Sequence, residues 1–152
     1  MPALTAKILN FTQAIGPLID VEYPLAASVA FKYLGGKFVT LDGNERAALT
    51  VAGDTRITGW ALAAEFTSNA TAGVDKITVN LSREAAYWMP ASGAVTRDLV
   101  RKQCDIITSA AGLQQANIAA STTDVLTILD VDIANQYVLV QIYDTVAPAG
   151  VV

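Results

Sequence analysis

The chain has 152 residues, of which 53% are apolar and only 16% are charged, and its formal net charge is −4 with no histidine. A chain of this length forms one domain with a sizeable core. Ordinary domains contain about 25% charged residues, so we expect other subunits to cover part of the apolar surface. The acidic balance argues against a nucleic-acid partner, and the apolar runs are far shorter than the roughly 18 residues of a membrane span.

The charges are divided unevenly along the chain. All ten lysines and arginines lie within residues 1–102, whereas residues 103–152 contain five aspartates and no base. Opposite charges on facing protomers guide association, but acidic loops that are merely solvated explain the same pattern, and both interpretations stay open. The single cysteine, Cys104, excludes a disulfide framework and is expected to be a buried, unreactive thiol. Residues 1–20 lack the pattern of a secretory signal peptide, so we expect synthesis in the cytoplasm.

Residues 1–24 are rich in apolar side chains but follow neither the period of a strand nor that of a helix. Three prolines and Gly16 interrupt them, which prevents one long regular element. Chain termini are ordered mainly where they are tied down, so we expect an extended N-terminal arm that lies over its own domain or over a neighbour. Its apolar side chains are our first candidates for a partner interface: Ile8, Leu9, Phe11, Ile15, Leu18 and Ile19.

The remaining residues, 25–152, are predicted to form a single β domain. In the segment 74–81, Ile77, Val79 and Leu81 alternate with polar neighbours, which indicates one buried and one solvated face. Short strands with turns at regular spacing predict an all-β fold, an antiparallel β-sandwich or barrel. The predicted strands are 28–33, 37–41, 46–52, 56–66, 74–81, 124–132 and 136–143.

Turn chemistry supports these strands. Asp42-Gly43-Asn44 has the composition of a hairpin turn, and Gly53-Asp54 and Ala134-Asn135 separate other pairs of apolar runs. Gly59 lies inside a predicted strand, where glycine indicates a bulge or a close approach of another backbone. Both tryptophans, Trp60 and Trp88, are expected in or beside the main core, because an aromatic side chain buries about 150–250 Å².

Two segments allow more than one interpretation, and one short helix therefore remains open. In the segment 96–111, the spacing of Val100, Cys104 and Ile107 favours a helix with Thr96 as its N-cap. The shorter run 103–108 is β-branched and equally acceptable as a strand.

Segment 82–89 allows a helical turn. Its aromatic end, Tyr87-Trp88-Met89, is either part of the core or a platform for a sugar or a protein partner, and we include these three residues among the interface candidates.

The chain lacks the groups that common catalytic sites require. Without histidine there is no triad and no imidazole base, and no glycine pattern matches a phosphate-binding loop. Asp124, Asp130 and Asp132 have the oxygen chemistry that Ca²⁺ prefers, but a solvated strand face whose charges discourage edge pairing explains them better. We therefore expect no enzyme, no cofactor and no metal site.

Two stretches together resemble a known class of protein. The first runs from Val51-Ala52-Gly53 through Thr58-Gly59-Trp60-Ala61 to Ala86-Tyr87-Trp88-Met89-Pro90, and the second contains Cys104-Asp105-Ile106-Ile107-Thr108, residues 119–127 and Tyr137-Val138-Leu139-Val140. They are similar to the small proteins that decorate or cement the heads of tailed bacteriophages. The resemblance spans about residues 45–145.

The resemblance implies a β-rich homotrimer without catalytic residues. Such a protein lies on the exterior of the capsid at its threefold and quasi-threefold positions, so the implied partner is the major capsid protein and the implied location is the virion. The resemblance also favours a strand over a helix for residues 103–108. No interface residue carries over from it, and the candidates named above are inferred from this sequence alone. The alternative is a carbohydrate- or host-binding β-module of a phage tail or head.

Overall fold

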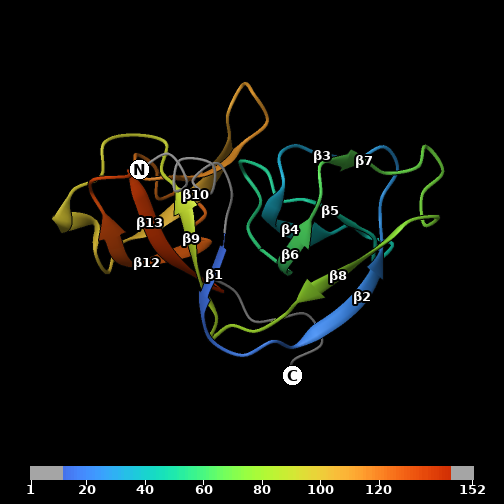
Figure 1. Ribbon diagram of the computed structural model, residues 1–152, viewed down its shortest axis with the longest axis horizontal. Helices are drawn as coiled ribbons and strands as arrows, with labels where there is room; N and C mark the ends of the chain where they lie inside the picture. The colour runs from blue at the N-terminus through green and yellow to red at the C-terminus, as the bar shows by residue number, and fades with distance from the viewer. Residues whose placement is uncertain (1–11, 145–152) are drawn as a thin grey trace.

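The computed structural model describes residues 12–144, which form antiparallel strands in two curled sheets that pack side by side (Figure 1). The one helical element in this range is a 3-10 turn, η1, at Arg97–Leu99. The predicted all-β class is therefore confirmed, with the two sheets in a sandwich and half-barrel arrangement. Within the same range there is no helix of the length and apolarity that crossing a membrane requires.

The six-stranded sheet has the order β1-β9-β13-β12-β10-β11. Its inner face forms the larger core, in which Tyr87, Met89, Ile106, Ile128 and Val140 are fully or almost fully buried. A register shift between Ile128 and Asp130 marks a bulge, a feature that increases the twist of a sheet. The strands are β1 (Thr12–Ile15), β9 (Ala86–Pro90), β13 (Tyr137–Ile142), β12 (Leu126–Asp132), β10 (Gln103–Thr108) and β11 (Gln114–Asn117).

The five-stranded sheet has the order β2-β8-β6-β4-β5 and curls around a second core. Its two ends approach each other, because Leu25, directly after β2, forms a bridge with Ala47 of β5. The pair β3 and β7 packs on the same core, where the rings of Phe31 and Phe66 stack 4.9 Å apart. The strands are β2 (Asp20–Pro24), β8 (Lys76–Asn80), β6 (Gly59–Ala63), β4 (Gly35–Leu41), β5 (Ala47–Leu49), β3 (Ala30–Phe31) and β7 (Phe66–Thr67).

The two sheets meet through aromatic and amide side chains. Phe38 and Trp60 leave the five-stranded sheet on its outer face and enter the larger core, where both rings contact Tyr87. Gln114 of β11 hydrogen bonds to the backbone of β4. The two halves of the molecule are therefore joined by side chains of one sheet that are buried against the other.

Several predicted elements are confirmed. Asp42 closes the β4–β5 hairpin by accepting hydrogen bonds from the N–H groups of Asn44 and Arg46, and β12 and β13 form the predicted hairpin. The close approach at Gly59 is real, since a Cβ there would lie 2.4 Å from the carbonyl oxygen of Asn80. Residues 103–108 form a strand, as the resemblance favoured.

Other boundaries are corrected. The predicted strand 56–66 is divided into β6 and β7, and the predicted strand 46–52 is reduced to three residues. The strands on either side of Gly53-Asp54 are not neighbours, because β4 lies between them. Residues 86–90 form β9, in the segment for which a helical turn was considered, and the polar strand β11 was not predicted.

The described part of the predicted N-terminal arm, residues 12–24, is extended but belongs to the domain. β1 pairs with β9 in one sheet, and β2 pairs with β8 in the other. Gly16 and Pro17 make the break between the two strands that the sequence indicates. The boundary expected at residue 24 therefore does not separate an arm from a domain within residues 12–144.

Candidate partner-binding surface

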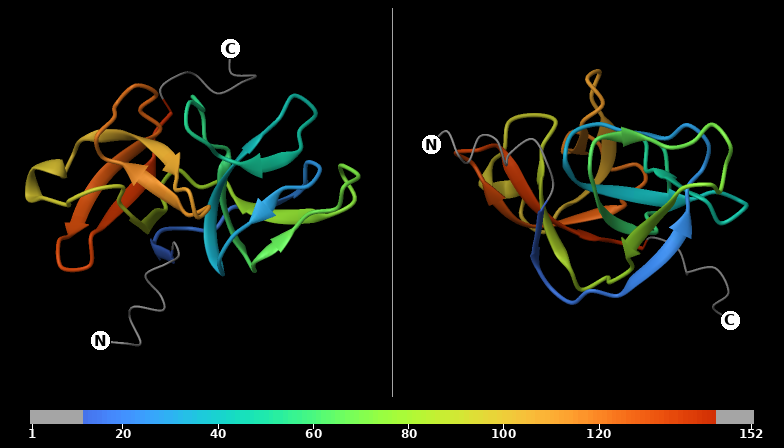
Figure 2. Two further views of the ribbon diagram at one scale, coloured as in Figure 1. Left: turned by 90° about the horizontal axis from the view of Figure 1, so that it is seen from above. Right: turned by 45° about the vertical axis from the view of Figure 1, so that its right-hand side comes forward.

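The segment of residues 12–24 forms an edge of both sheets. β1 is the outermost strand of the six-stranded sheet and β2 is the outermost strand of the five-stranded sheet. Figures 1 and 2 show this segment, in blue, crossing from one half of the molecule to the other along its periphery. Edge strands present backbone N–H and C=O groups without sheet partners, and they are common sites of strand pairing with other chains.

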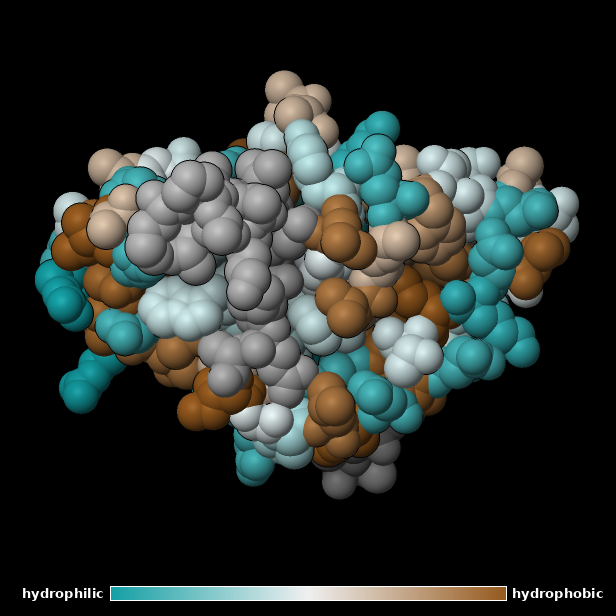
Figure 3. Space-filling view, viewed as in Figure 1, coloured by the Kyte–Doolittle hydropathy of each residue, from teal (hydrophilic) through white to brown (hydrophobic). Residues whose placement is uncertain are grey.

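Four large apolar side chains project into solvent from this segment. Ile15 is 60% exposed, Leu18 64%, Ile19 54% and Val21 38%. We call these four residues the apolar edge. Figure 3 shows hydrophobic side chains between the two halves and, interspersed with polar ones, along the lower margin of the molecule, where the segment runs in Figure 1. A contiguous group of exposed apolar residues indicates an interaction site, whereas single ones do not.

A shallow cavity of about 310 Å³ adjoins the apolar edge. Leu18 and the exposed Leu62 of β6 form its apolar walls, and the buried indole of Trp60 lies between them. Asp20, Thr78 and Asn80 complete the lining. The apolar walls suit an apolar side chain inserted by a partner, and the polar residues of the lining suit hydrogen bonds to the partner's neighbouring groups.

The side chain of Asn80 fixes the backbone conformation of the apolar edge. Its buried carboxamide oxygen accepts the N–H of Ile19 at 2.9 Å and that of Ser82 at 3.1 Å. Its Nδ2 donates to the Pro17 carbonyl and to the Tyr87 hydroxyl. Because these bonds hold the backbone on both sides of Leu18, the apolar side chains face outward.

Gly16 allows the backbone of the apolar edge to lie close to the backbone of Ala85. A Cβ at this position would lie 2.5 Å from Cα of Ala85. The φ of Gly16 is +106°, a value that glycine adopts readily. Tyr87, which accepts the hydrogen bond from Asn80, is itself buried, and burial raises the pKa of its hydroxyl to about 12. The hydroxyl is therefore protonated at neutral pH.

We expect Asn80→Ala to loosen the apolar edge. The variant loses four hydrogen bonds, to Ile19, Ser82, Pro17 and Tyr87. Each lost bond to a buried group costs about 1 kcal/mol or more, so the free energy of unfolding should fall by about 2–4 kcal/mol. Relative to the parent, amide hydrogen exchange should become faster at Ile19 in this variant. The increase should be larger than at Val138, a fully buried position of β13. Thr78→Ala, an exposed change on the same strand, is the control and should leave both rates unchanged. Equal rates at Ile19 in Asn80→Ala and the parent would show that Asn80 does not fix the edge.

The predicted interface residues fall into three groups. Ile15, Leu18 and Ile19 are exposed and lie together on the apolar edge. Ile8, Leu9 and Phe11 lie outside the described residues. The aromatic candidates are corrected, because Tyr87 and Met89 are 0% exposed in the larger core and only Trp88 is half-buried. A platform for a sugar cannot be formed by Tyr87 and Met89 in this fold.

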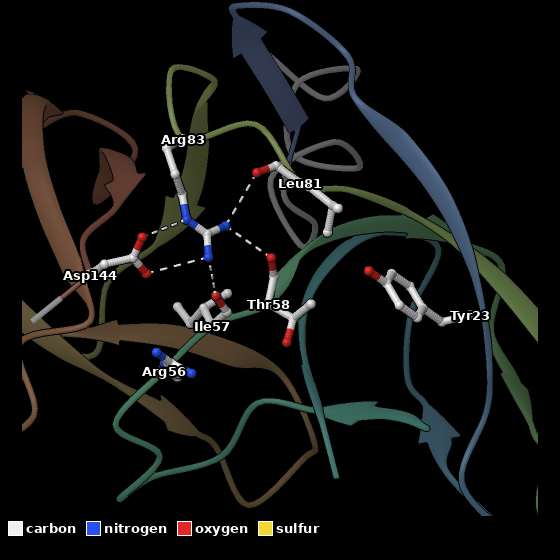
Figure 4. A pocket seen from close by; sticks show the side chains of 7 residues that line it. All are labelled: Tyr23, Arg56, Ile57, Thr58, Leu81, Arg83 and Asp144. Atoms are coloured by element: carbon white, nitrogen blue, oxygen red, sulfur yellow. Dashed lines mark hydrogen bonds and ion pairs between the residues drawn. The ribbon is translucent and has the colours of Figure 1, made fainter. Parts of the chain in front are cut away.

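A second cavity, of about 370 Å³, lies where the two halves meet (Figure 4). Arg83 spans it, donating to both carboxylate oxygens of Asp144 and to the carbonyl oxygens of Ile57 and Thr58. Its guanidinium thus has an acid and backbone acceptors as partners, which is the arrangement of a structural clamp. Tyr23 lines the opposite side.

The acidic residues that were candidates for a cation are not gathered into one site. Asp124 accepts a hydrogen bond from the Ser121 hydroxyl. Oδ1 of Asp130 lies 3.7 Å from a guanidinium nitrogen of Arg97, and the carboxylate of Asp132 accepts a hydrogen bond from the side-chain amide of Asn135. Across residues 12–144, no group of three or more potential metal ligands is close enough to hold an ion.

The sequence did not reveal the anchoring role of another acid, Asp105. Its carboxylate accepts the N–H groups of Thr122, Thr123 and Asp124. Burial acts to raise the pKa of this carboxyl, but the three N–H groups outweigh it and the pKa is lowered. Asp105 therefore anchors a loop as a carboxylate.

Comparisons with models of protein families, with curated proteins and with solved structures find no match to this chain.

The sequence did not identify Asn80 or Leu62 as parts of the site. Alternation placed Asn80 on the solvated face of its strand, but the other sheet covers that face at this end, where Trp60 and Tyr87 pack. Leu62 lies in the predicted strand 56–66, where nothing in the apolar run marks it as exposed, and its face of β6 is open to solvent beyond Trp60. A long-range packing contact decides both positions, and no local pattern contains it.

Proposed function

We propose that the protein is a structural, non-catalytic virion protein that binds the outer surface of a phage capsid and stabilises the shell by bridging neighbouring capsid subunits. The observation that carries this proposal is the apolar edge, a set of exposed large apolar side chains on β1, on β2 and on the connection between them, where these strands form edges of two sheets. A surface of this kind suits docking against another protein. The resemblance to decoration proteins supplies the identity of that partner.

Such a protein would act mechanically, by holding capsid subunits together. Packed DNA strains a shell, and a clamp that contacts several subunits opposes their separation. A standard interface buries about 1,600 Å², and three equivalent contacts made together raise the overall affinity about 100-fold or more. A homotrimer, as expected from the low share of charged residues, gains in this way without strong individual contacts.

Replacing the centre of the apolar edge by acids tests the proposal. Leu18→Asp/Ile19→Asp should lower binding to undecorated phage heads by about 100-fold, because each fully buried side chain contributes about 1.5–3 kcal/mol and each 1.4 kcal/mol is tenfold in affinity. The heads would be assembled from the major capsid protein of the same phage, and bound protein would be measured by co-sedimentation. Circular dichroism should stay that of the parent, since both side chains are exposed.

Ile133→Asp is the matched control, because Ile133 is 46% exposed but lies in the β12–β13 turn, outside the apolar edge. It should bind as the parent does. Absence of binding by the parent protein to any form of the head would overturn the proposed function. Equal binding by the parent and the double variant would remove the apolar edge from it.

A further inference from the structure

The outer side of β2 is open to an additional strand along its first residues, before the bridge between Leu25 and Ala47 of β5. Among residues 12–144, β2 pairs with β8 alone, and Figures 1 and 2 show no described strand beyond it. In an antiparallel pair, successive residues direct their backbone groups alternately to one side and to the other. The residues of β2 that point away from β8 therefore define what another chain would meet.

Two hydrogen bonds beyond the ends of β2 fix this register. The carbonyl oxygen of Ile19 accepts from the N–H of Leu81, and the N–H of Leu25 donates to Asp75. Odd-numbered residues thus face β8, so the backbone groups of Asp20, Glu22 and Pro24 point outward. Asp20 and Glu22 offer two N–H donors and two C=O acceptors. Pro24 has no N–H, and beyond it the N–H of Ala26 donates to the carbonyl oxygen of Ala47, so β5 closes this end of the edge.

The side chains of the edge alternate between acidic and apolar. Asp20 and Glu22 are exposed on one face of the sheet, and Ile19 and Val21 are exposed on the other. Glu22 pairs with Lys76, whose Nζ lies 3.7 Å from the Glu22 carboxylate, and both side chains are about 60% exposed. An exposed pair of this kind contributes little stability, so a bound base can replace Lys76 as the partner of Glu22.

This pattern disfavours pairing of β2 with a second copy of itself. With a twofold axis at Glu22, Glu22 faces Glu22, and with the axis at Val21, Asp20 faces Glu22. Like charges directly opposite each other destabilise an antiparallel pair, whereas opposite charges stabilise it. The edge selects against a second copy and in favour of a basic strand.

We propose that the β2 edge binds an extended segment of a partner protein, in which lysine or arginine alternates with apolar residues, as a sixth strand of the five-stranded sheet. The bases contact Asp20 and Glu22 on one face, and the apolar side chains pack beside Ile19 and Val21 on the other. This inference rests on the proposed function in so far as the partner is a capsid subunit. The chemistry of the segment follows from β2 alone.

The test uses the full-length protein labelled with ¹⁵N and a synthetic peptide of alternating lysine and valine. Binding should slow amide hydrogen exchange at Asp20 and Glu22, whose N–H groups point outward, and leave Val21 and Tyr23 almost unchanged, because these already bond to β8. The same peptide methylated on alternate backbone nitrogens keeps its charge but cannot complete the ladder, so it should give no protection. Protection by both peptides, or by neither, overturns the proposal.

Three variants separate the contribution of side-chain charge to peptide binding from that of the backbone hydrogen bonds. Asp20→Lys/Glu22→Lys should weaken the binding of the lysine peptide about tenfold and create binding of a glutamate–valine peptide, since each of the two cross-strand charge pairs changes affinity up to about fivefold. Glu22→Pro removes an outward donor and should abolish protection, whereas Glu22→Ala retains the donor and should bind with an intermediate affinity. An unchanged affinity in all three variants contradicts a strand at this edge.

Binding to phage heads distinguishes this inference from the proposed function. Heads that bind the parent and all three variants equally would leave the function standing and remove the β2 edge as the docking site. Protection of Asp20 and Glu22 by the peptide, without binding of the protein to heads, would establish the edge and overturn the capsid as its partner.

Discussion

Gln114→Ala should lower the free energy of unfolding by about 3–5 kcal/mol. Gln114 lies in β11 and is almost fully buried. Its Oε1 accepts the N–H of Phe38 at 2.8 Å, and its Nε2 donates to the carbonyl oxygens of Phe38 and Thr50, both at 2.9 Å. These three bonds join the two sheets where water cannot replace them, and losing a bond to a buried group costs about 1–3 kcal/mol. Since native domains are stable by only about 5–15 kcal/mol, the variant should be marginally folded.

Gln115→Ala is the matched control for this prediction. Gln115 is half-buried on the opposite face of β11, and its side chain makes one hydrogen bond of 3.4 Å, to Ala91. Its replacement should lower the free energy of unfolding by less than about 1 kcal/mol. Denaturant unfolding followed by tryptophan fluorescence suits both variants, because Trp60 stacks on Tyr87 beside Phe38. Similar losses in the two variants would mean that Gln114 does not couple the sheets.

The elements that the sequence predicts well are those with two local signals. β12 and β13 combine apolar alternation with a turn at Ala134-Asn135, and both were expected within two residues of their ends. The β4–β5 hairpin has an Asp42 whose side chain bonds to its own turn. In these cases the energy that determines the structure comes from neighbours in the chain.

The elements that the sequence misses depend on contacts between distant residues. β11 has the sequence Gln-Gln-Ala-Asn, which lacks the apolar alternation of a strand, and it is held by pairing with β10 and by the bonds of Gln114 to β4. Residues 12–24 look irregular because prolines and a glycine divide them, although each half has an edge to pair with. The apolar edge was predicted as a set of residues, but its position on both sheets required the topology.

Buried ionisable groups should give the protein an unusual stability profile in alkaline solution. Burial, with smaller contributions from the charges of Asp105 and Asp124, raises the pKa of the Cys104 thiol from 9.0 to about 12. The folded state then keeps a proton that the unfolded chain releases, so stability is lost as the pH rises from 9 to 12. At about 1.4 kcal/mol per pKa unit, the loss from Cys104 approaches about 4 kcal/mol. Tyr87 adds to it above pH 10, because burial raises the pKa of its hydroxyl from 10.0 to about 12.

Lys37 acts in the opposite direction. Its amine is buried among the carbonyl oxygens of Tyr33, Gly35 and Ala63. Burial lowers the pKa of this amine from 10.5 to about 8, against the opposing charge of Glu65. The unfolded chain therefore binds the proton more tightly, and stability rises between pH 8 and 10.5 by up to about 3 kcal/mol. The parent protein should become more stable from pH 8 to 9, stay nearly level to pH 10 and then lose stability steeply.

Two variants resolve these opposing contributions. Cys104→Ala should continue to gain stability up to about pH 10, because the loss that begins at pH 9 is removed. Lys37→Met should show no gain above pH 8 and should lose stability from pH 9 onward. The measurement is the free energy of unfolding by denaturant at intervals of pH, and the slopes are compared because each variant has its own baseline at neutral pH. Parallel slopes in the parent and both variants would show that neither the thiol nor the amine changes its pKa on folding, and the burial of these two groups would then have to be far less complete than the fold indicates.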